Sequence, residues 1–377
     1  MSKSFNIFLQ SAIIFIILLI IGFWLAAKKP LWNDEAYSQY RSVQGVSYAQ
    51  ILMGGVPEGN VCPLFYVIQK VVTDVSGYAL PDPWDGRVVT DVKAQWIYRV
   101  APNACMALAM TLIFYFFARH YSWCWGVYAL MLSLSSFMVW AYWVEARPYA
   151  LWFLLTVLQL MALIKLLSKN NFRGWYGLLC LSHVLLSLTV FFSIIQITII
   201  MFLWWLAGNR RRASYLFAFV LPLTVGLFYY ARAPHYAFVL DQSLWGLITL
   251  NLSSDILYIA VAYVFFAGYG YFKKWQSPLE GPIFFLLLVL MGLAGVALIM
   301  VMSMGQPAGV QGFSITARYL VYLTPVGIIG AVVLLKQMRD AVRHDWFFSS
   351  MMAIVLTGLF IQRCLEAYML TLGWYTF

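Results

Sequence analysis

Long apolar runs separated by short polar segments set the pattern of this chain. Residues 8–27 contain no charged side chain, and about 20 such residues are enough to cross a bilayer as one helix. Similar runs predict about eleven spans in all. They lie at 8–27, 98–119, 122–142, 148–168, 174–190, 191–207, 213–231, 256–272, 282–304, 319–336 and 347–370. The pattern therefore predicts an all-α polytopic membrane protein that forms a single domain over residues 1–377.

The composition agrees with a bundle embedded in a membrane. Hydrophobic residues make up 63% of the chain and charged residues 10%, whereas soluble domains carry about 25% charged residues. A net charge of +10 would suggest nucleic acid binding in a soluble protein, but here much of it lies in short loops between apolar runs. The charge therefore indicates membrane orientation and anionic lipid headgroups as partners, and no nucleic acid.

Residues 28–96 form the single long loop that the pattern predicts. Lysine and arginine gather in the short segments 165–173, 208–212 and 336–345, among others, which are therefore predicted to be cytoplasmic. The long loop then lies on the extracytoplasmic face. Within it, apolar positions at helical spacing in 36–53 and 63–76 predict two helices that lie flat at the membrane interface.

Two adjacent carboxylates, Asp34 and Glu35, follow directly after the first apolar run. The whole chain has only 14 acidic residues, so a pair at the membrane boundary calls for an explanation. Neighbouring carboxylates can share a cation, and a carboxylate where water is limited can act as a general base. The alternative is structural, because acidic residues are also favoured at the N-terminus of an interfacial helix.

Several arginines are predicted to lie at the same face of the membrane as Asp34. Arg147 could pair with Glu145, or its guanidinium group could hold a lipid phosphate. Arg99 and Arg318 each begin a predicted span, where the structural alternative is an anchor that reaches to the headgroups. Taken together, acids and arginines converging at one depth favour an anionic, phosphate-bearing ligand.

Four segments together resemble the GT-C superfamily of membrane glycosyltransferases. The most similar group is family 39, in particular bacterial relatives of protein O-mannosyltransferases and aminoarabinose transferases. The segments are Leu31–Ser38, Tyr98–Pro102 with the apolar run that ends in Ala118-Arg119, Glu145–Leu151 and Ala317–Leu320. As an arrangement of helices, the likeness covers roughly residues 1–340, and it implies a GT-C-like fold in the bacterial inner membrane.

The resemblance implies transfer of a monosaccharide from a polyprenyl-phosphate donor, with inversion, on the periplasmic or exterior face. Asp34 would be the general base that deprotonates the acceptor. Glu35 would orient the acceptor. The residues implied to hold the donor phosphate are Arg99, Arg147, Arg318 and Tyr319. The acceptor could be a lipid, a polysaccharide or a protein.

Further roles implied by the resemblance concern the acceptor and a metal ion. Glu145, Tyr149 and Tyr66 are implied to support the site or bind the acceptor. Asp34, Glu35 and Glu145 could together hold a divalent cation such as Mg, Mn, Ca or Zn. The chain departs from many relatives at Val61–Tyr66, where they carry a His-Pro-Pro-Leu-Tyr-like sequence and this chain has no histidine. The alternatives are a non-catalytic scaffold of the same fold and a carrier of lipid-linked sugars.

Overall fold

The computed structural model describes most of the N-terminal two-thirds of the chain and part of the remainder. The described residues are 3–80, 91–168, 172–207, 215–233, 238–239, 287, 290–295, 313–314 and 320–341, with isolated helical positions at 350, 357, 358, 361 and 365. Within these residues the protein is helical apart from one short parallel pairing, in which β1 (Phe238–Val239) lies beside β2 (Phe313–Ser314). The predicted span 256–272 and most of 282–304 and 347–370 lie outside the described residues.

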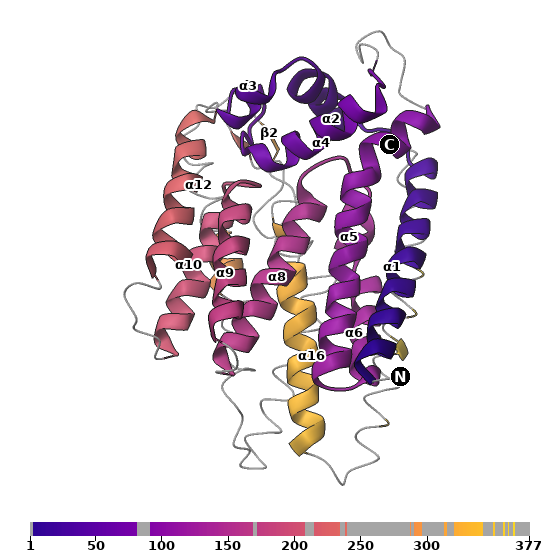
Figure 1. Ribbon diagram of the computed structural model, residues 1–377, viewed down its shortest axis with the longest axis vertical. Helices are drawn as coiled ribbons and strands as arrows, with labels where there is room; N and C mark the ends of the chain where they lie inside the picture. Colours follow the sequence, from indigo (N-terminus) through magenta and orange to yellow (C-terminus); the bar gives the residue numbers. More distant parts are fainter. Residues whose placement is uncertain are drawn as a thin grey trace.

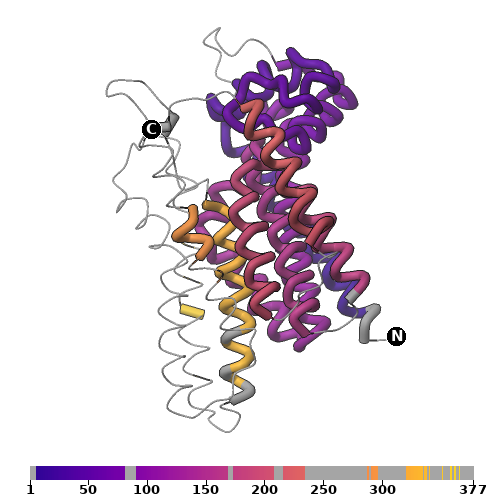
Figure 2. Tube along the Cα trace, turned by 90° about the vertical axis from the view of Figure 1, so that its left-hand side faces the viewer, coloured from indigo at the N-terminus to yellow at the C-terminus, as the bar shows by residue number. Residues whose placement is uncertain are grey.

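Three described helices are long and apolar enough to cross a membrane. They are α1 (Lys3–Lys28), α5 (Val92–His120) and α8 (Tyr149–Leu167). Four shorter apolar helices accompany them: Trp123–Leu134, Ser193–Leu206, Leu216–Arg232 and Leu323–Gln337. Figures 1 and 2 show long helices running side by side, with α2, α3 and α4 gathered at one end.

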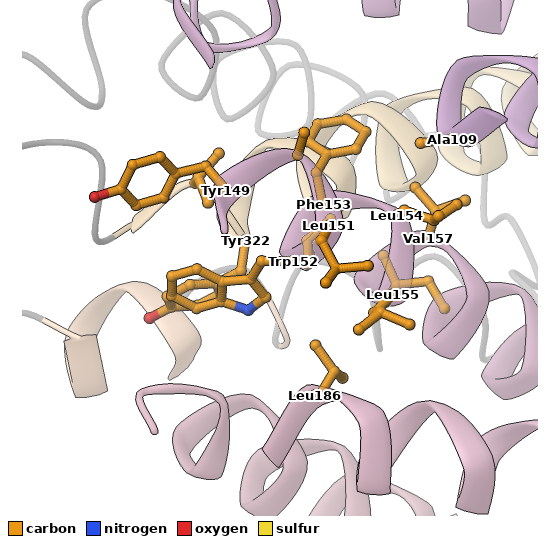
Figure 3. Packing of buried hydrophobic residues seen from close by; sticks show 14 of the residues in the cluster. Ala109, Tyr149, Leu151, Trp152, Phe153, Leu154, Leu155, Val157, Leu186 and Tyr322 are labelled. Carbon is orange, nitrogen blue, oxygen red and sulfur yellow. The ribbon is translucent and has the colours of Figure 1, made fainter. Parts of the chain in front are cut away.

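Helix α8 is the centre of the described bundle, and α1 is at its edge. The most apolar window of α8 is 83% buried, whereas that of α1 is 22% buried. Figure 3 shows α8 side chains beside residues of other elements, and the Trp152 ring stacks on Tyr322, the residue before α16 (Leu323–Ala341), at a centroid distance of 5.2 Å. A membrane-spanning helix contacts either protein or lipid, which explains why the pattern at 148–168 has no polar face.

The run 174–207 forms two helices, as its weak polar interruption predicted. Helix α9 spans Phe172–Ser187 and α10 spans Ser193–Leu206. The turn between them meets the layer of short helices, because the Leu64 N–H donates to the Leu188 carbonyl oxygen (2.8 Å). The chain reverses where backbone carbonyls have partners outside the bundle, which lets a turn lie among apolar helices.

The span predicted over 122–142 is not a single helix. The structure has α6 (Trp123–Leu134) and α7 (Phe137–Tyr142), separated at Ser135 and Ser136. The Ser135 hydroxyl donates to the Leu132 carbonyl (2.8 Å), and the Trp140 indole donates to the Leu134 carbonyl (2.6 Å). Side-chain donors thus satisfy the last carbonyls of α6, so the helix ends there without a loss of hydrogen bonds.

The layer over one end of the bundle contains four short helical segments. They are α2 (Asn33–Tyr37), the π-helix η1 (Ser38–Gln44), α3 (Tyr48–Leu52) and α4 (Pro63–Ser76). The helix predicted over 63–76 has these bounds, because Pro63 suits the first turn and Gly77 ends the helix with a φ of +61°. The single helix predicted over 36–53 is instead divided, since Ser47 caps a new helix by accepting from the Gln50 N–H.

A proline inside α5 joins this layer to the bundle. Pro102 has no N–H, so the carbonyl oxygen of Tyr98 lacks its usual helical donor. The side-chain amide of Gln69, in α4, donates to that carbonyl at 2.7 Å. Helix α4 is therefore fixed over the first turns of α5, directly beside the residues of the candidate site.

Candidate functional site

A buried ion pair between Glu35 and Arg99 forms the base of the site. Arg99 Nε donates to Glu35 Oε1 at 3.0 Å, and Arg99 Nη2 lies 2.5 Å from Glu35 Oε2. Both side chains are fully inaccessible to solvent. Such a two-bond contact is the geometry in which guanidinium and carboxylate bind most strongly.

The rest of the Arg99 guanidinium holds the end of α1. It donates to the backbone carbonyls of Ala26 (3.1 Å), Lys29 and Pro30 (2.8 Å). The last carbonyls of a helix have no partner within the helix, and a cation there is favourable. Arg99 therefore connects α5 to the point at which the chain leaves α1 and enters the motif.

Glu35 also binds two backbone N–H groups from separate segments. Those of Trp32 and Ala146 donate to its carboxylate at 2.9 and 2.6 Å. Burial alone would raise the pKa of Glu35, but the Arg99 guanidinium, with help from Lys29 and the Ala146 N–H, keeps that pKa below its ordinary value. Glu35 is therefore a charged residue that fixes the positions of α2, α5 and the turn before α8.

Asp34, the other member of the acidic pair, has a different environment. It is partly exposed, whereas Glu35 is buried. Successive residues of a helix point about 100° apart, so adjacent acids in α2 face different surroundings. The backbone carbonyl of Asp34 accepts from Arg147 Nη1 at 3.4 Å, and the negative charge of Asp34 contributes to raising the pKa of Arg147.

Arg147 lies in the turn before α8 and binds three segments of the layer. Its Nη1 donates to the Ser38 hydroxyl and to both carboxylate oxygens of Glu58, at 3.3 and 3.2 Å. Glu58 in turn accepts from the Ser38 hydroxyl. The side chains of Arg147 and Glu58 are only 12% and 8% exposed, so this ion pair is largely shielded from solvent.

Two tyrosines that the sequence analysis singled out, Tyr66 and Tyr149, lie close to Arg147. Burial and the negative charge of Glu58 raise the pKa of Tyr66 well above its usual value, and its hydroxyl donates to the Asn60 carbonyl (2.9 Å). Figure 3 shows the Tyr149 ring at the end of the packed α8 side chains, with its hydroxyl directed away from them. Although burial opposes it, the charge of Glu58, with smaller contributions from both tyrosines, raises the pKa of Arg147 and keeps the guanidinium charged.

The structure thus brings together six of the predicted residues and adds two others. Those brought together are Asp34, Glu35, Tyr66, Arg99, Arg147 and Tyr149. The additions are Ser38 and Glu58. The sequence signal for Glu58 was an acid, rare in this chain, within the turn-rich segment 54–60. Arg147 forms an ion pair with Glu58, a partner that the sequence did not suggest.

The remaining predicted residues are placed differently. Glu145 is buried, two residues before Arg147. Arg318 and Tyr319 lie outside the described residues. Among the part of the chain that the structure describes, no group of three or more His, Cys, Asp or Glu side chains is arranged to hold a metal ion.

Comparison with known proteins gives no relative on which to base an assignment. No protein-family model, curated protein or solved structure matches this chain. The function proposed below therefore depends on the residues and their geometry.

Proposed function

We propose that this protein is an integral-membrane glycosyltransferase that moves a monosaccharide from a polyprenyl-phosphate donor to an acceptor, with inversion at the anomeric carbon. The reaction takes place at the end of the bundle that carries α2 to α4. The single observation that carries the proposal is a partly exposed acid, Asp34, whose backbone carbonyl accepts from the shielded guanidinium group of Arg147, at the end of apolar helices.

The orientation of the site follows from the charges at the two ends of the helices. Helices α5 and α8 both begin at the α2–α4 end, and their last turns carry Arg119 and Lys165. A positive far end supports an extracytoplasmic site in a bacterial inner membrane. The proposed architecture is a GT-C-like bundle of about eleven spans.

Asp34 is the proposed general base. The acceptor hydroxyl gives its proton to the Asp34 carboxylate while its oxygen forms a bond to the anomeric carbon. The bond from that carbon to the phosphate oxygen breaks, and the lipid phosphate leaves with the electron pair. Glu35 does not compete for the proton, because its charge is held by Arg99, and two adjacent acids thereby take separate roles.

Arg147 is the proposed ligand of the donor phosphate. A guanidinium group in a shielded site stabilises negative charge that grows on the leaving phosphate. Arg318 and Tyr319 are proposed to act with it, as the motif resemblance implies. Arg99 is assigned a positioning role, because its guanidinium is bound to Glu35 and to the carbonyls at the end of α1.

The experiment is a transfer assay with purified protein in lipid. Radiolabelled polyprenyl-phosphate sugars are offered with lipid, polysaccharide and secreted-protein acceptors. We expect Asp34→Asn to reduce transfer by about 10²–10⁴-fold, the usual contribution of a general base. Asp74→Asn is the matched control, because Asp74 is a largely exposed acid of α4 whose partners are Lys70 and Tyr48.

Three outcomes decide the proposal. A transfer rate of Asp34→Asn equal to that of the wild type would show that Asp34 is not the base. Binding of donor without transfer of any sugar would favour the scaffold or carrier alternative. Loss of transfer in EDTA, with recovery on adding Mg²⁺ or Mn²⁺, would add a divalent cation to the proposed site.

A further inference from the structure

The contact between Arg147 and Glu58 is poorly matched compared with the other ion pair of the site. Glu58 receives both of its contacts from Nη1 alone, at 3.3 and 3.2 Å, whereas Glu35 is bound by two different nitrogens of Arg99. Charge-assisted hydrogen bonds in a fork are usually about 2.7–2.9 Å long. The Arg147–Glu58 pair is therefore the looser of the two.

Arg147 also keeps an unused donor. Among the described residues, its buried Nε has no hydrogen-bond partner. A buried donor without a partner is unfavourable, so natural sites rarely retain one. A tetrahedral phosphate could accept from Nε and Nη2, which share one edge of the guanidinium group, and its negative charge would then repel the Glu58 carboxylate on Nη1.

Glu58 belongs to a segment that is tied to its surroundings at both ends. The Tyr37 hydroxyl donates to the Pro57 carbonyl (3.4 Å), and the Asn60 side chain donates to the Thr189 carbonyl (2.9 Å). Residues 54–60 therefore connect α2, which carries Asp34, with the turn between α9 and α10. A displacement of Glu58 is transmitted to both.

We propose that Glu58 occupies the anion position on Arg147 in the resting protein and is displaced by the donor phosphate. The inference rests on the proposed function, since it takes Arg147 as the phosphate ligand. In this inference, residues 54–60 supply the Glu58 carboxylate as the anion that binds Arg147 when no donor phosphate is bound. The carboxylate keeps the shielded guanidinium paired while the donor is absent, which avoids the large cost of a buried, unpaired charge.

The displacement predicts that removing the charge of Glu58 tightens binding. The probe is a short-chain polyprenyl monophosphate added to protein in nanodiscs of zwitterionic lipid, with polyprenyl alcohol and inorganic phosphate as separate arms. We expect Glu58→Gln to bind the polyprenyl monophosphate about 5- to 150-fold more tightly, the usual range of coupling between two competing interactions. The affinity for polyprenyl alcohol should be the same in both proteins. Binding of inorganic phosphate shows whether the lipid chain is required.

A second variant and a measurement on the wild type guard against misfolding of Glu58→Gln. Ser38→Ala removes the hydroxyl that holds Glu58 but leaves both charges, so it should also tighten binding, by a smaller factor. In the wild-type protein, hydrogen exchange of amides 54–60 should become faster on saturation with polyprenyl monophosphate. Asp74→Asn, which alters an acid outside the site, should bind as the wild type does.

The outcomes separate this inference from the proposed function. If polyprenyl monophosphate binds equally well to wild type and Arg147→Ala, then Arg147 is not the phosphate ligand and both proposals fail. If binding needs Arg147 but Glu58→Gln and Ser38→Ala bind no more tightly, the displacement of Glu58 alone is overturned. Unchanged exchange of amides 54–60 in the saturated wild type would overturn it as well.

Discussion

The Glu35 carboxylate accepts from two nitrogens of Arg99 across 64 residues of sequence, at 3.0 and 2.5 Å, in a place that solvent does not reach. Because Arg99 also binds carbonyls at the end of α1, the pair fixes the segment that presents Asp34. A buried charge without its partner is strongly unfavourable. The pair therefore serves the site by holding it together.

Removing one partner of this pair should destabilise the protein. We expect Glu35→Ala and Arg99→Ala each to lower the free energy of unfolding by about 3–5 kcal/mol, because each leaves an unpaired buried charge. Replacing both residues, in Glu35→Leu/Arg99→Met, should cost less than the sum of the single changes. The measurement is denaturant or thermal unfolding followed by tryptophan fluorescence in detergent.

The control for these variants is an ion pair whose acid is exposed. Asp74→Ala removes the partner of Lys70, at a distance of 3.5 Å and with a largely exposed Asp74 side chain. Pairs of this kind contribute about 0–1 kcal/mol. Equal destabilisation by Asp74→Ala and Glu35→Ala would show that burial of the Glu35–Arg99 pair has no special effect.

The same pair predicts a pH dependence of stability. The pKa of Glu35 in the folded protein lies below its ordinary value of 4.5, so the unfolded chain takes up a proton first as the pH falls. The contribution of Glu35 is therefore fully present above pH 4.5 and decreases as the pH falls from there towards the lowered pKa. The check is the difference in unfolding free energy between wild type and Glu35→Gln, measured against pH. The contributions of the other carboxylates are the same in both proteins and cancel in this difference. A difference that already decreases near neutral pH would mean that the pKa is raised.

The sequence predicted those parts of the fold that depend on local signals. Helix α4 was predicted with its observed bounds from apolar positions at helical spacing, and in the structure Pro63 begins the helix and Gly77 ends it. The break between α6 and α7 was not predicted, because it depends on hydrogen bonds from the Ser135 and Trp140 side chains to backbone carbonyls. Every apolar segment has such carbonyls, so they give no sequence signal. Local composition does not distinguish this use of serine and tryptophan from ordinary packing.

The sequence predicted most residues of the candidate site, but it did not predict which of them interact with one another. Asp34 and Glu35 are equivalent in a hydropathy pattern, and only the packing of α2 shows which of them is buried. Glu58 is separated from Arg147 by 89 residues, and no periodicity connects a turn to a helix end at that distance. The partner of a buried arginine is a property of the three-dimensional arrangement.

The bond between Gln69 and Tyr98 gives a prediction that a double-mutant cycle can measure. Gln69→Leu should cost about 1–3 kcal/mol, because the Tyr98 carbonyl, freed by Pro102, is left without a donor. Pro102→Ala restores an N–H at position 102, which can donate to that carbonyl within α5. In the Pro102→Ala background, Gln69→Leu should therefore cost less, and the coupling appears in the unfolding free energies. Identical costs in both backgrounds would contradict the assignment of Gln69 as the substitute donor.

The contact between α1 and α5 depends on a glycine. A Cβ added at Gly22 would lie 1.7 Å from Asn103 Oδ1 and 2.8 Å from Trp143 Nε1. Asn103 cannot easily move aside, because it accepts from the Trp143 indole (3.0 Å) and donates to the Leu19 carbonyl (3.0 Å). The added methyl group must therefore separate the helices or break these buried hydrogen bonds.

We accordingly expect Gly22→Ala to destabilise the protein by about 1–3 kcal/mol, the usual cost of overpacking, even though alanine favours helices. Gly177→Ala is the matched control, since a Cβ at Gly177 of α9 meets no atom within 4 Å. That variant should be neutral or up to about 1 kcal/mol more stable, because only the helix propensity changes. The thermal unfolding midpoint of Gly22→Ala should therefore fall, whereas that of Gly177→Ala should rise or stay the same. A midpoint for Gly22→Ala equal to that of Gly177→Ala would show that α1 and α5 are not packed as closely as the Gly22–Asn103 contact requires.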